Sequence, residues 1–386
     1  MPVLLLLVLL ILALAVTPSV ARPPLFEETD VFVGGQDNIN TYRIPSVACT
    51  AQGTVLVFCE ARKDNNTDGS PTDLVLKRSL GNAGPWDPPT TAGPVPGSRS
   101  RANNMTWQPM QIVLAATGPE SFMNPVPLID REDGTIYLLV NHHPTYDPAV
   151  ADAEGSHVWL LTSKDEGATW SAPVDLEPSV GRHELGPGVG IQMRGGRFVV
   201  PVYDGVIYSD DRGKTWHAGS RTTGPISETQ VVERVDGSLV LNTRSAPQRT
   251  LVISKDGGET WEAPRPDPVL TDSELWDGCQ ASLLRYSWEG RSRILFANPA
   301  DRKHRFDLTV RMSYDDGCSW PVAKRVKQGV GGYSCLTVFP DGTVGLVYET
   351  GNSYEGGIVE YYAKLSFARF NLEWLTGGQD ASQPAR

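Results

Sequence analysis

The chain has 386 residues, of which 40% are hydrophobic, and it contains 38 glycines, 30 prolines and 10 tryptophans. This composition is typical of a globular protein rich in turns, and it is unlike that of a helical bundle or a disordered chain. The formal net charge of −11 argues against a nucleic-acid groove, which requires a basic surface. An anionic ligand would therefore need a local basic pocket.

An uncharged apolar run at positions 3–16 opens the chain, and such a run is typical of a secretory signal peptide. Small residues that end at Ala21 provide a cleavage site. A transmembrane anchor needs about 20 apolar residues, whereas this run is interrupted at Thr17. We therefore expect a cleaved signal peptide over residues 1–21 and a single, translocated domain over residues 22–386, without a stable membrane span.

The five cysteines are an odd number and have no metal-binding spacing, so they indicate neither a disulfide framework nor a zinc site. One or two disulfide bonds are compatible with an oxidising compartment, but the spacing assigns no pairing. Two Asn-x-Thr sequons begin at Asn65 and Asn104, and they matter where the host glycosylates. The cysteines are Cys49, Cys59, Cys279, Cys318 and Cys335.

An eight-residue pattern, Ser-x-Asp-x-Gly-x-x-Trp, occurs four times, and a decayed fifth copy spans residues 79–86. The Asp can accept backbone hydrogen bonds within a turn, the Gly supplies a positive φ, and the Trp packs a hairpin against its neighbour. We interpret these Asp boxes as structural elements of hairpins rather than as catalytic groups. The four complete boxes begin at Ser163, Ser209, Ser254 and Ser313.

A second periodicity consists of a turn glycine followed by an apolar, β-rich run, and it occurs six times. A strand-like segment at 363–370 ends the sixth unit and is suited to closing a ring. Such repeats predict an all-β fold, a six-bladed β-propeller with four strands in each blade. A two-sheet sandwich would not explain the repeated Asp boxes. The turn glycines are Gly53, Gly134, Gly196, Gly237, Gly290 and Gly342.

Strand geometry places the residues roughly seven after each turn glycine, and roughly nine or ten before it, at the end of the hairpin opposite the turn. Counting forward gives a polar residue in all six units, and counting backward gives three further candidates. These positions predict a polar rim at one end of the propeller axis. The forward positions are Glu60, Asn141, Tyr203, Arg244, Asn298 and Glu349, and the backward positions are Arg43, Glu228 and Tyr333.

Three arginines, Arg43, Arg244 and Arg311, are candidates to bind an anion, because each lies on a predicted strand. The planar guanidinium group suits a carboxylate. The alternative is that all three are surface residues in ion pairs. Two of the three fall on the rim by counting alone, which favours the cluster.

Tyr333 is a candidate nucleophile, but a tyrosine with a pKa of about 10 is a poor nucleophile unaided. Glu228 on the same rim can act as its base, and nearby arginines lower the cost of forming the phenolate. Asp68 lies on a polar loop and can serve as a general acid. Asp64 and Asp73 are alternatives to Asp68 for this role.

The Arg43-Ile-Pro sequence, the Asp boxes and the three arginines make the chain resemble exo-α-sialidases (neuraminidases). It is most similar to the secreted or lysosomal branch of that family, and the resemblance covers essentially the whole mature chain. The segment Phe58–Arg62 resembles the second-strand motif of the family, which implies that Arg62 contributes to the substrate pocket. The acid aspartate of the family lies twenty-five residues after the Arg of Arg-Ile-Pro, which selects Asp68.

The resemblance also implies roles for residues on the rim. Glu228 matches the Glu that pairs with the nucleophilic tyrosine, Tyr333 matches that tyrosine, and Glu349 matches the carboxylate that orients the first arginine. A closed ring places the sixth blade beside the first, so a contact between Glu349 and Arg43 is expected.

The predicted function is that of a glycoside hydrolase, a retaining exo-α-sialidase acting on terminal α-linked sialic acids of glycoproteins, gangliosides and oligosaccharides. In this scheme Tyr333 forms a tyrosyl-enzyme intermediate, Glu228 activates it, and Asp68 is the acid and later the base. The arginines bind the substrate carboxylate. No metal and no organic cofactor are expected.

Two other functions remain open at this point. A sialic-acid-binding lectin would keep the arginines, but the joint presence of Tyr333, Glu228 and Asp68 argues against it. A trans-sialidase would share all these residues and would use an aromatic acceptor platform, for which Trp107 and Trp276 are candidates.

Overall fold

The computed structural model describes residues 22–80, 105–146, 156–224, 227–287, 291–354 and 357–382. Over these residues the regular secondary structure is almost entirely β-strand, and the strands form five sheets. The predicted all-β fold is confirmed. The predicted signal peptide at 1–21, the Trp of the decayed fifth Asp box and the sequon at Asn104 lie outside the described residues.

The largest sheet contains eight strands in two antiparallel groups of four, which meet through a parallel pairing of Thr72 with Ser121. The first group contains β2 (Thr41–Cys49), β3 (Val55–Arg62), β4 (Thr72–Ser79) and β5 (Gln111–Leu114). The second group contains β6 (Ser121–Ile129), β7 (Ile136–His143), β8 (His157–Ser163) and β9 (Val174–Asp175).

The next three sheets each have four antiparallel strands in chain order. One sheet contains β10 (Ile191–Gln192), β11 (Phe198–Val202), β12 (Gly205–Ser209) and β13 (His217–Ala218). The following sheet contains β14 (Thr229–Glu233), β15 (Leu239–Thr243), β16 (Gln248–Ser254) and β17 (Arg265–Thr271). The third contains β18 (Ser282–Ser287), β19 (Arg293–Pro299), β20 (Leu308–Ser313) and β21 (Val322–Arg325).

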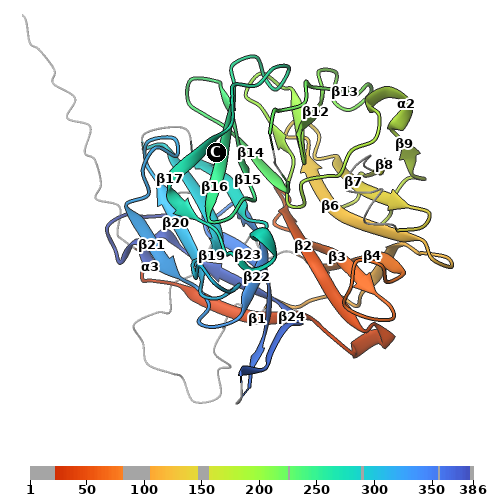
Figure 1. Cartoon of the computed structure of the whole chain (residues 1–386), viewed down its shortest axis with the longest axis horizontal. Coiled ribbons are helices and arrows are strands. Elements are labelled where there is room, and N and C mark those ends of the chain that lie inside the picture. The colour runs from red at the N-terminus through yellow and green to blue at the C-terminus, as the bar shows by residue number, and fades with distance from the viewer. Residues whose placement is uncertain are drawn as a thin grey trace, which may run out of the picture.

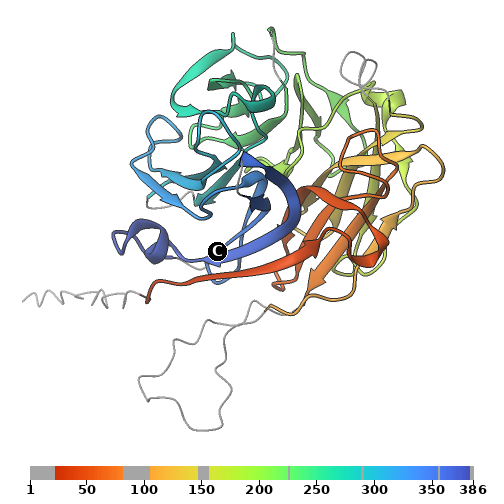
Figure 2. The same ribbon diagram turned by 60° about the horizontal axis from the view of Figure 1, so that its bottom comes forward.

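The last sheet combines strands from both ends of the described chain. Its order is β22 (Gly331–Val338), β23 (Val344–Ser353), β24 (Val359–Phe370) and β1 (Phe26–Val33). The segment 363–370, predicted to close the ring, is part of β24. The outermost strand is β1, which the sequence analysis did not predict because no turn glycine marks it. Figures 1 and 2 show the sheets following one another around a central axis, with the blue C-terminal strands beside the red N-terminal strand.

Hydrophobic clusters fill the spaces between successive groups of strands. Phe58 of β3 shares one cluster with Leu138 of β7, which joins the first two groups. At the other end of the series, Val57 of β3 shares a cluster with Val347 of β23. The last sheet is therefore packed against the first group of strands, and the ring is closed by hydrophobic contact.

The Asp boxes share one hydrogen-bonding pattern, which the box at 254–261 illustrates. Ser254 Oγ donates to Asp256 Oδ1 (2.7 Å) and accepts from Gly258 N (2.8 Å). Asp256 Oδ1 also accepts from Thr260 N at 2.9 Å. Burial acts to raise the pKa of Asp256, but the hydrogen bonds that its carboxylate accepts, first from the Thr260 hydroxyl and then from Thr260 N and Ser254 Oγ, lower this pKa to about 2. The carboxylate therefore stabilises the turn in its ionised form.

Helices are few in the described part of the chain. The α-helices are α2 (Glu177–Val180) and α3 (Leu372–Thr376), and two short 3-10 turns are η1 (Gln36–Asn38) and η2 (Leu275–Asp277). Across the described residues, no helix has the length and apolar character needed to cross a membrane. All five cysteines are unpaired.

The tryptophan of the second complete Asp box provides a test of the structural role of these boxes. Trp216 is buried among side chains of two neighbouring strand groups, and its Nε1 donates to the carbonyl of Gly213 at 3.2 Å. We expect Trp216→Ala to lower the free energy of unfolding by about 3 kcal/mol, measured by urea denaturation, while kinetic constants per folded molecule stay near wild type.

Lys214→Ala provides a matched control, because Lys214 is exposed in the same Asp box. It should change the free energy of unfolding by less than about 0.5 kcal/mol. A Trp216→Ala protein that is stable but inactive would contradict the structural interpretation of the box.

Candidate active site

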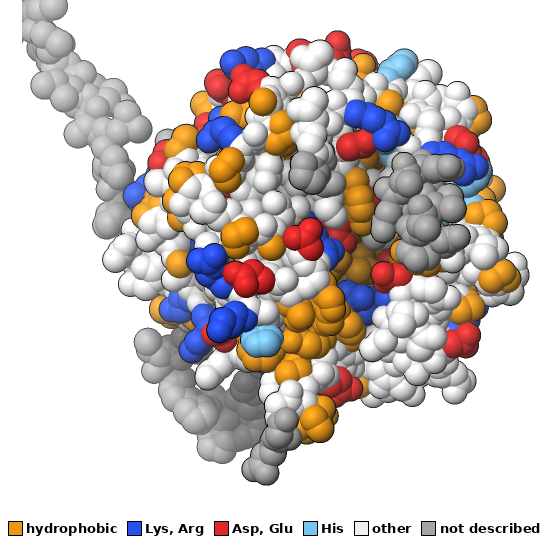
Figure 3. Space-filling model, in the orientation of Figure 1, with side chains coloured by type: hydrophobic (Ala, Val, Ile, Leu, Met, Phe, Trp, Pro, Cys, Tyr) orange, Lys and Arg blue, Asp and Glu red, His pale blue; other side chains and the backbone are white. Residues whose placement is uncertain are grey.

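A cavity of about 680 Å³ opens at the predicted polar rim. Figure 3 shows a hollow near the centre of this face of the molecule. Of the eight site residues predicted from the sequence, Glu349 and Arg311 do not line the cavity. The six that do are Arg43, Arg62, Asp68, Glu228, Arg244 and Tyr333.

Three strands around the cavity, β2, β6 and β22, have a β-bulge or irregular register at their cavity ends. Such irregularities re-aim side chains that a regular strand would point elsewhere. They lie beside Arg43, at Asn124 and at Tyr333. Ile44 and Asn124 have φ angles of 52° and 53°, which are unusual for residues other than glycine. The sequence analysis counted regular strands and did not predict these irregularities.

Tyr333 and Glu228 are hydrogen bonded, with the Tyr333 hydroxyl donating to Glu228 Oε1. Arg244 Nη1 lies 2.9 Å from Tyr333 Oη and 2.9 Å from Glu228 Oε2. Burial and the neighbouring Glu228 raise the pKa of Tyr333 well above its usual value, although the surrounding arginines act to lower it. Tyr333 is therefore a neutral phenol with a carboxylate in place to accept its proton.

Arg43 is oriented by Glu349, as expected for a closed ring. Arg43 Nε donates to Glu349 Oε1 at 2.8 Å, and Glu349 Oε2 accepts from the backbone N–H of Tyr333 at 3.2 Å. The guanidinium carbon of Arg43 lies 3.8 Å from the centre of the Tyr362 ring. A Cβ on Gly332 would lie 2.6 Å from Glu349 Oε2, so glycine permits this close approach.

Arg244 is oriented by the turn η2. Its Nη2 donates to the carbonyl of Trp276, and its Nε donates to the carbonyl of Asp277 at 3.3 Å. The segment that carries these carbonyls is held by Asp272, whose Oδ1 accepts from the backbone N–H of Cys279 at 2.9 Å. Asp272 also forms a buried ion pair, in which its Oδ2 lies 2.5 Å from Arg249 Nη1. Arg244 is therefore held by the loop as well as by Glu228.

The third arginine beside Tyr333, after Arg43 and Arg244, is Arg305, and the predicted Arg311 lies elsewhere. The guanidinium carbon of Arg305 lies 5.2 Å from the centre of the Tyr333 ring, and Nη2 donates to the carbonyl of Gly278 at 2.8 Å. Among the described residues Arg305 has no carboxylate partner, and its Nε has no hydrogen-bond partner. Arg311 Nη1 instead donates to Asn298 Oδ1 at 2.9 Å.

The direction of β20 explains why Arg311 does not reach the cavity. Strand β19 ends at the rim, and β20 begins there at Leu308 and runs away from it. Arg311 is three residues along β20, which places it about 10 Å from the rim end. The sequence signal for the third arginine lay in the connection between the two strands, where Arg302 and Arg305 occur.

Arg62 is completely buried and lies between two carboxylates. Its Nη2 is 2.6 Å from Glu60 Oε2 and 2.6 Å from Asp68 Oδ1. Burial raises the pKa of Glu60 in spite of Arg62. The Asp68 side chain is 52% exposed. Burial acts to raise the pKa of Asp68, but Arg62 and Arg43 outweigh it and lower that pKa.

The alternatives to Asp68 do not line the cavity. Asp73 is buried and forms an ion pair with Lys63, with 2.8 Å between Nζ and Oδ1. Asp64 is exposed. Asp68 is therefore the aspartate of this loop that reaches the cavity.

Further polar residues of the cavity were not predicted. Asn124 Nδ2 lies 3.3 Å from Asn141 Oδ1 and 3.3 Å from Glu184 Oε2. Glu184 lies beside His143, with 3.6 Å between Oε1 and Nε2. Burial lowers the pKa of His143 to about 4, so this imidazole is neutral near pH 7. Asn124 lies ten residues before Gly134, at the same offset as Arg43 from Gly53, but it was not singled out, whereas Glu184 lies outside the counted positions.

The two tryptophans proposed as acceptor platforms differ in position. Trp276 lines the cavity. Trp107 packs against the core, with its ring centre 5.5 Å from that of Phe367. Trp276 is therefore the one available to a ligand in the cavity.

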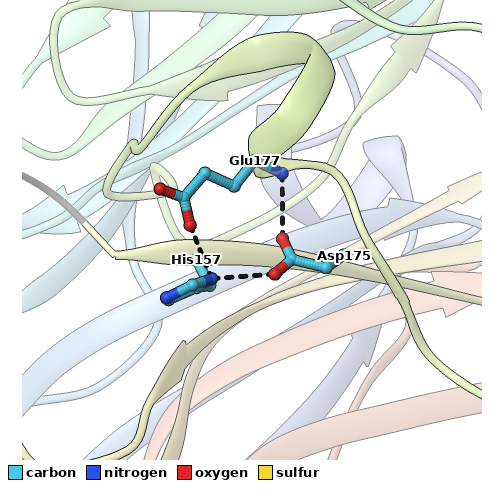
Figure 4. Close-up of side chains that lie close together, drawn as sticks. All are labelled: His157, Asp175 and Glu177. Carbon is cyan, nitrogen blue, oxygen red and sulfur yellow. Dashed lines mark hydrogen bonds and ion pairs between the residues drawn. The ribbon is translucent and has the colours of Figure 1, made fainter.

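A separate group of side chains, shown in Figure 4, lies outside the cavity. His157 Nδ1 is 2.8 Å from Asp175 Oδ2 and 2.8 Å from Glu177 Oε2. Asp175 Oδ1 also accepts from the backbone N–H of Glu177 at 2.9 Å, at the start of α2. These contacts account for the arrangement without a metal ion.

Comparison with known proteins agrees with this geometry. Residues 95–346 match a family model described as a BNR repeat-like domain. The sialidase of Micromonospora viridifaciens is 33% identical over 92% of this chain and 55% of its own length. The exo-alpha-sialidase of Aspergillus fumigatus is 29% identical over 94% of each chain.

A solved structure of an intramolecular trans-sialidase from Ruminococcus gnavus matches with a TM-score of 0.72 at 20% identity, covering 90% of this chain and 98% of that chain. This similarity indicates the same propeller-type fold. The chain spans about half the length of the Micromonospora relative, and the family model covers well over half of the chain. The chain therefore belongs to the sialidase family of glycoside hydrolases, within the BNR repeat-like proteins.

Proposed function

We propose that this protein is a retaining exo-α-sialidase, which hydrolyses terminal α-linked sialic acids of glycoproteins, gangliosides and oligosaccharides through a tyrosyl-enzyme intermediate. The observation that carries the proposal is the charge balance around Tyr333. Arg43 and Arg244 each have a carboxylate partner, whereas Arg305 has none among the described residues. The cluster therefore has a place for one further carboxylate. Sialic acid carries a carboxylate on the carbon whose bond is cleaved.

The arginine cluster is strong enough to bind an anion to a protein of net charge −11. The planar guanidinium group matches the geometry of a carboxylate. At a separation of ~4 Å and an effective dielectric constant of ~20, each pair is attractive by about 4 kcal/mol before desolvation.

In the first step, Tyr333 Oη forms a bond to the anomeric carbon as the bond between that carbon and the leaving oxygen breaks. Glu228 takes the phenol proton, and Asp68 gives a proton to the leaving oxygen. A neutral phenol suits this step because the substrate carboxylate would repel an Asp or Glu nucleophile. The raised pKa of Tyr333 supports this form of the nucleophile.

In the second step, water attacks the anomeric carbon while Asp68 takes a proton from the water. The bond between the sugar and Tyr333 Oη breaks, and Glu228 returns its proton to that oxygen. Two displacements at one carbon retain its configuration, so the sialic acid is released as the α-anomer.

The reaction should be faster under acidic conditions, because Asp68 must be protonated to act as the general acid. A general acid must be protonated before the step, and Arg62 and Arg43 lower the pKa of Asp68 in the free protein. The protonated fraction of free Asp68 therefore rises as the pH falls. A bound substrate excludes water from Asp68 and thereby raises the pKa of Asp68, which opposes the effect of the two arginines.

The number of propeller blades and the cellular location of the protein are part of the same proposal. We interpret the sheets as six four-stranded blades, with the eight-stranded sheet counted as two, and the Asp boxes as stabilisers of the blade hairpins. The pairing pattern and the hydrogen bonds of the boxes support this interpretation. The apolar run at positions 3–16 supports secretion or lysosomal delivery.

Transfer of the sialyl group is the second candidate activity, because the half-exposed Trp276 lines the cavity beside Tyr333. An aromatic surface at this place can hold an acceptor other than water. Product analysis with and without an added lactose-type acceptor distinguishes the two activities. Hydrolysis gives free sialic acid in both mixtures, whereas transfer gives a new sialoside.

Substitution of the nucleophile tests the covalent route. Tyr333→Phe removes the oxygen that bonds to the anomeric carbon and leaves the three arginines in place. We expect turnover to fall by at least about 1,000-fold, while a sialic-acid inhibitor still binds, as measured by calorimetry. A Tyr333→Phe protein with near wild-type turnover would remove Tyr333 from this role.

The arginine assignment is tested by two alanine variants. Arg305→Ala should weaken inhibitor binding and lower kcat/KM together, each by roughly 10- to 100-fold, because carboxylate contacts persist into the transition state. Arg311→Ala should leave both quantities per folded molecule near wild type, because Arg311 contacts Asn298 outside the cavity.

Arg302→Ala provides a control for the same connection between strands, because the Arg302 side chain is 58% exposed and does not line the cavity. Binding that depends on Arg311 and not on Arg305 would overturn the assignment.

The acid role of Asp68 is tested with two leaving groups. A general acid matters most when the leaving group is poor, because a good leaving group departs without a proton. Asp68→Ala should therefore lose far more activity on sialyl-galactosides than on an aryl sialoside with an acidic phenol, measured as kcat/KM. Asp64→Ala and Asp73→Ala are the controls, and neither should lower kcat/KM for one substrate more than for the other. Equal losses on both substrates for Asp68→Ala would contradict the acid role.

A further inference from the structure

The sequon Asn65-Asn66-Thr67 has no role in the steps described above. It lies in the loop between β3 and β4, and the same loop carries the proposed acid Asp68. Asn65 is exposed and does not line the catalytic cavity, whereas Asn66, Thr67 and Asp68 do. Asn65 is therefore next to the mouth of the cavity in the chain but outside its lining.

The side chain of Asn65 has a free amide nitrogen. Its Oδ1 accepts from the backbone N–H of Thr67 at 2.9 Å and from Thr67 Oγ1 at 2.6 Å, whereas its Nδ2 has no hydrogen-bond partner among the described residues. N-glycosylation attaches a sugar to this nitrogen in an Asn-x-Ser/Thr sequence in which x is not proline, and x is Asn66 here. The folded loop can therefore carry a sugar on Asn65 without losing a hydrogen bond.

The backbone on both sides of Asn65 is held in place. Ser70 Oγ accepts from the backbone N–H of Asp64 at 3.0 Å and from that of Asn65 at 3.4 Å. On the other side, Arg62 Nη1 donates to the carbonyl of Asn66 at 2.7 Å, and Arg62 is completely buried. A group attached to Asn65 therefore starts from a fixed place relative to the cavity.

On the basis of the secretory location and the sialidase activity proposed above, we propose that Asn65 is N-glycosylated and that its glycan limits the access of large glycoproteins to the catalytic cavity. In the modification, Asn65 Nδ2 forms a bond to C1 of the first sugar of a lipid-linked diphospho-oligosaccharide. The bond between that carbon and the phosphate oxygen breaks, and the lipid diphosphate leaves. One amide hydrogen departs as a proton, and no group is oxidised or reduced.

The position of the glycan accounts for the selection by size. Asp68 is three residues after Asn65, so their Cα atoms are at most about 11 Å apart. An N-glycan is bulky, and on Asn65 it occupies space directly outside the cavity. A small sialoside can pass beside it, whereas a folded glycoprotein must bring its own surface and its other glycans up to the loop. The glycan therefore hinders large substrates without contacting the groups around Tyr333.

Mass spectrometry of the full chain, secreted from a eukaryotic cell line, tests the modification. We expect the peptide that contains Asn65 to carry a glycan in the wild type and in Thr67→Ser, which keeps the sequon, but not in Asn65→Gln. A secreted wild-type chain without a glycan on Asn65 would overturn the proposal. A chain that stays in the cytosol would overturn it together with the proposed location, so the two failures are distinct.

The effect of the glycan is tested with a large and a small substrate, a sialylated glycoprotein and sialyl-lactose. For secreted Asn65→Gln we expect the ratio of kcat/KM for the glycoprotein to that for sialyl-lactose to rise by about threefold. Trimming the wild type with an endoglycosidase that leaves one sugar on each modified Asn should raise the ratio by a similar factor. The same treatment of Asn65→Gln is the matched control and should leave its ratio unchanged, because any other glycan is trimmed there too.

An unchanged ratio in Asn65→Gln would overturn the steric role of the glycan. Equal rises of kcat/KM on both substrates would also overturn it, because they would show an effect on the catalytic cavity itself. If the wild type hydrolyses neither substrate, the proposed function fails and the selection by size fails with it, whereas the glycan found or not found on Asn65 still decides the modification.

Discussion

The arrangement around Tyr333 depends on how the positive charges of three arginines are compensated, of which Arg43 and Arg305 are buried and Arg244 is partly buried. Removing a charged group from water costs several kcal/mol unless the group finds partners. Arg43 is compensated by Glu349 and Arg244 by Glu228, whereas Arg305 contacts a carbonyl oxygen and aromatic rings. Among the described residues, Arg305 is therefore the one of the three without a carboxylate partner. In the proposed function the substrate carboxylate becomes that partner, so ligand binding also compensates the buried charge of Arg305.

The elements that stabilise the fold and those that form the cavity lie at opposite ends of the hairpins. Ser254, the first residue of an Asp box, pairs with Leu239, which lies two residues after the turn glycine Gly237. The rim residue Arg244 lies at the other end of the same hairpin, where its backbone N–H donates to the carbonyl of Glu228 at 2.8 Å. Hydrogen bonds that fix the turns can therefore change without moving the groups that surround Tyr333.

The sequence alone was sufficient for the parts of the site that depend on the regular period of a β-strand. Arg43, Glu228, Arg244 and Tyr333 were found by counting from turn glycines, because the period of two and the hairpin pairing fix where a strand residue lies. Arg305 was not found, because the connection between β19 and β20 has no period from which to count.

Two further features could not be predicted from the sequence, each for a different physical reason. The bulge at Asn124 depends on a positive φ angle, which no residue pattern announced. The position of β1 depends on a pairing between Phe26 and Phe370, a contact between distant parts of the chain. A local segment of sequence can indicate that β1 is a strand, but it cannot indicate that β24 is the strand with which β1 pairs.

The pairing of β1 with β24 determines the order in which the molecule can be assembled. Each internal hairpin joins residues that are close in the chain and can form early. The seam joins the first and the last of the described strands, so its formation closes a very long loop. Until β24 has been synthesised, β1 has no partner strand, and an unpaired edge strand can pair with other chains. The contact between Arg43 and Glu349, 306 residues apart, forms only once this seam is shut. The candidate active site is thus among the last parts of the described structure to form.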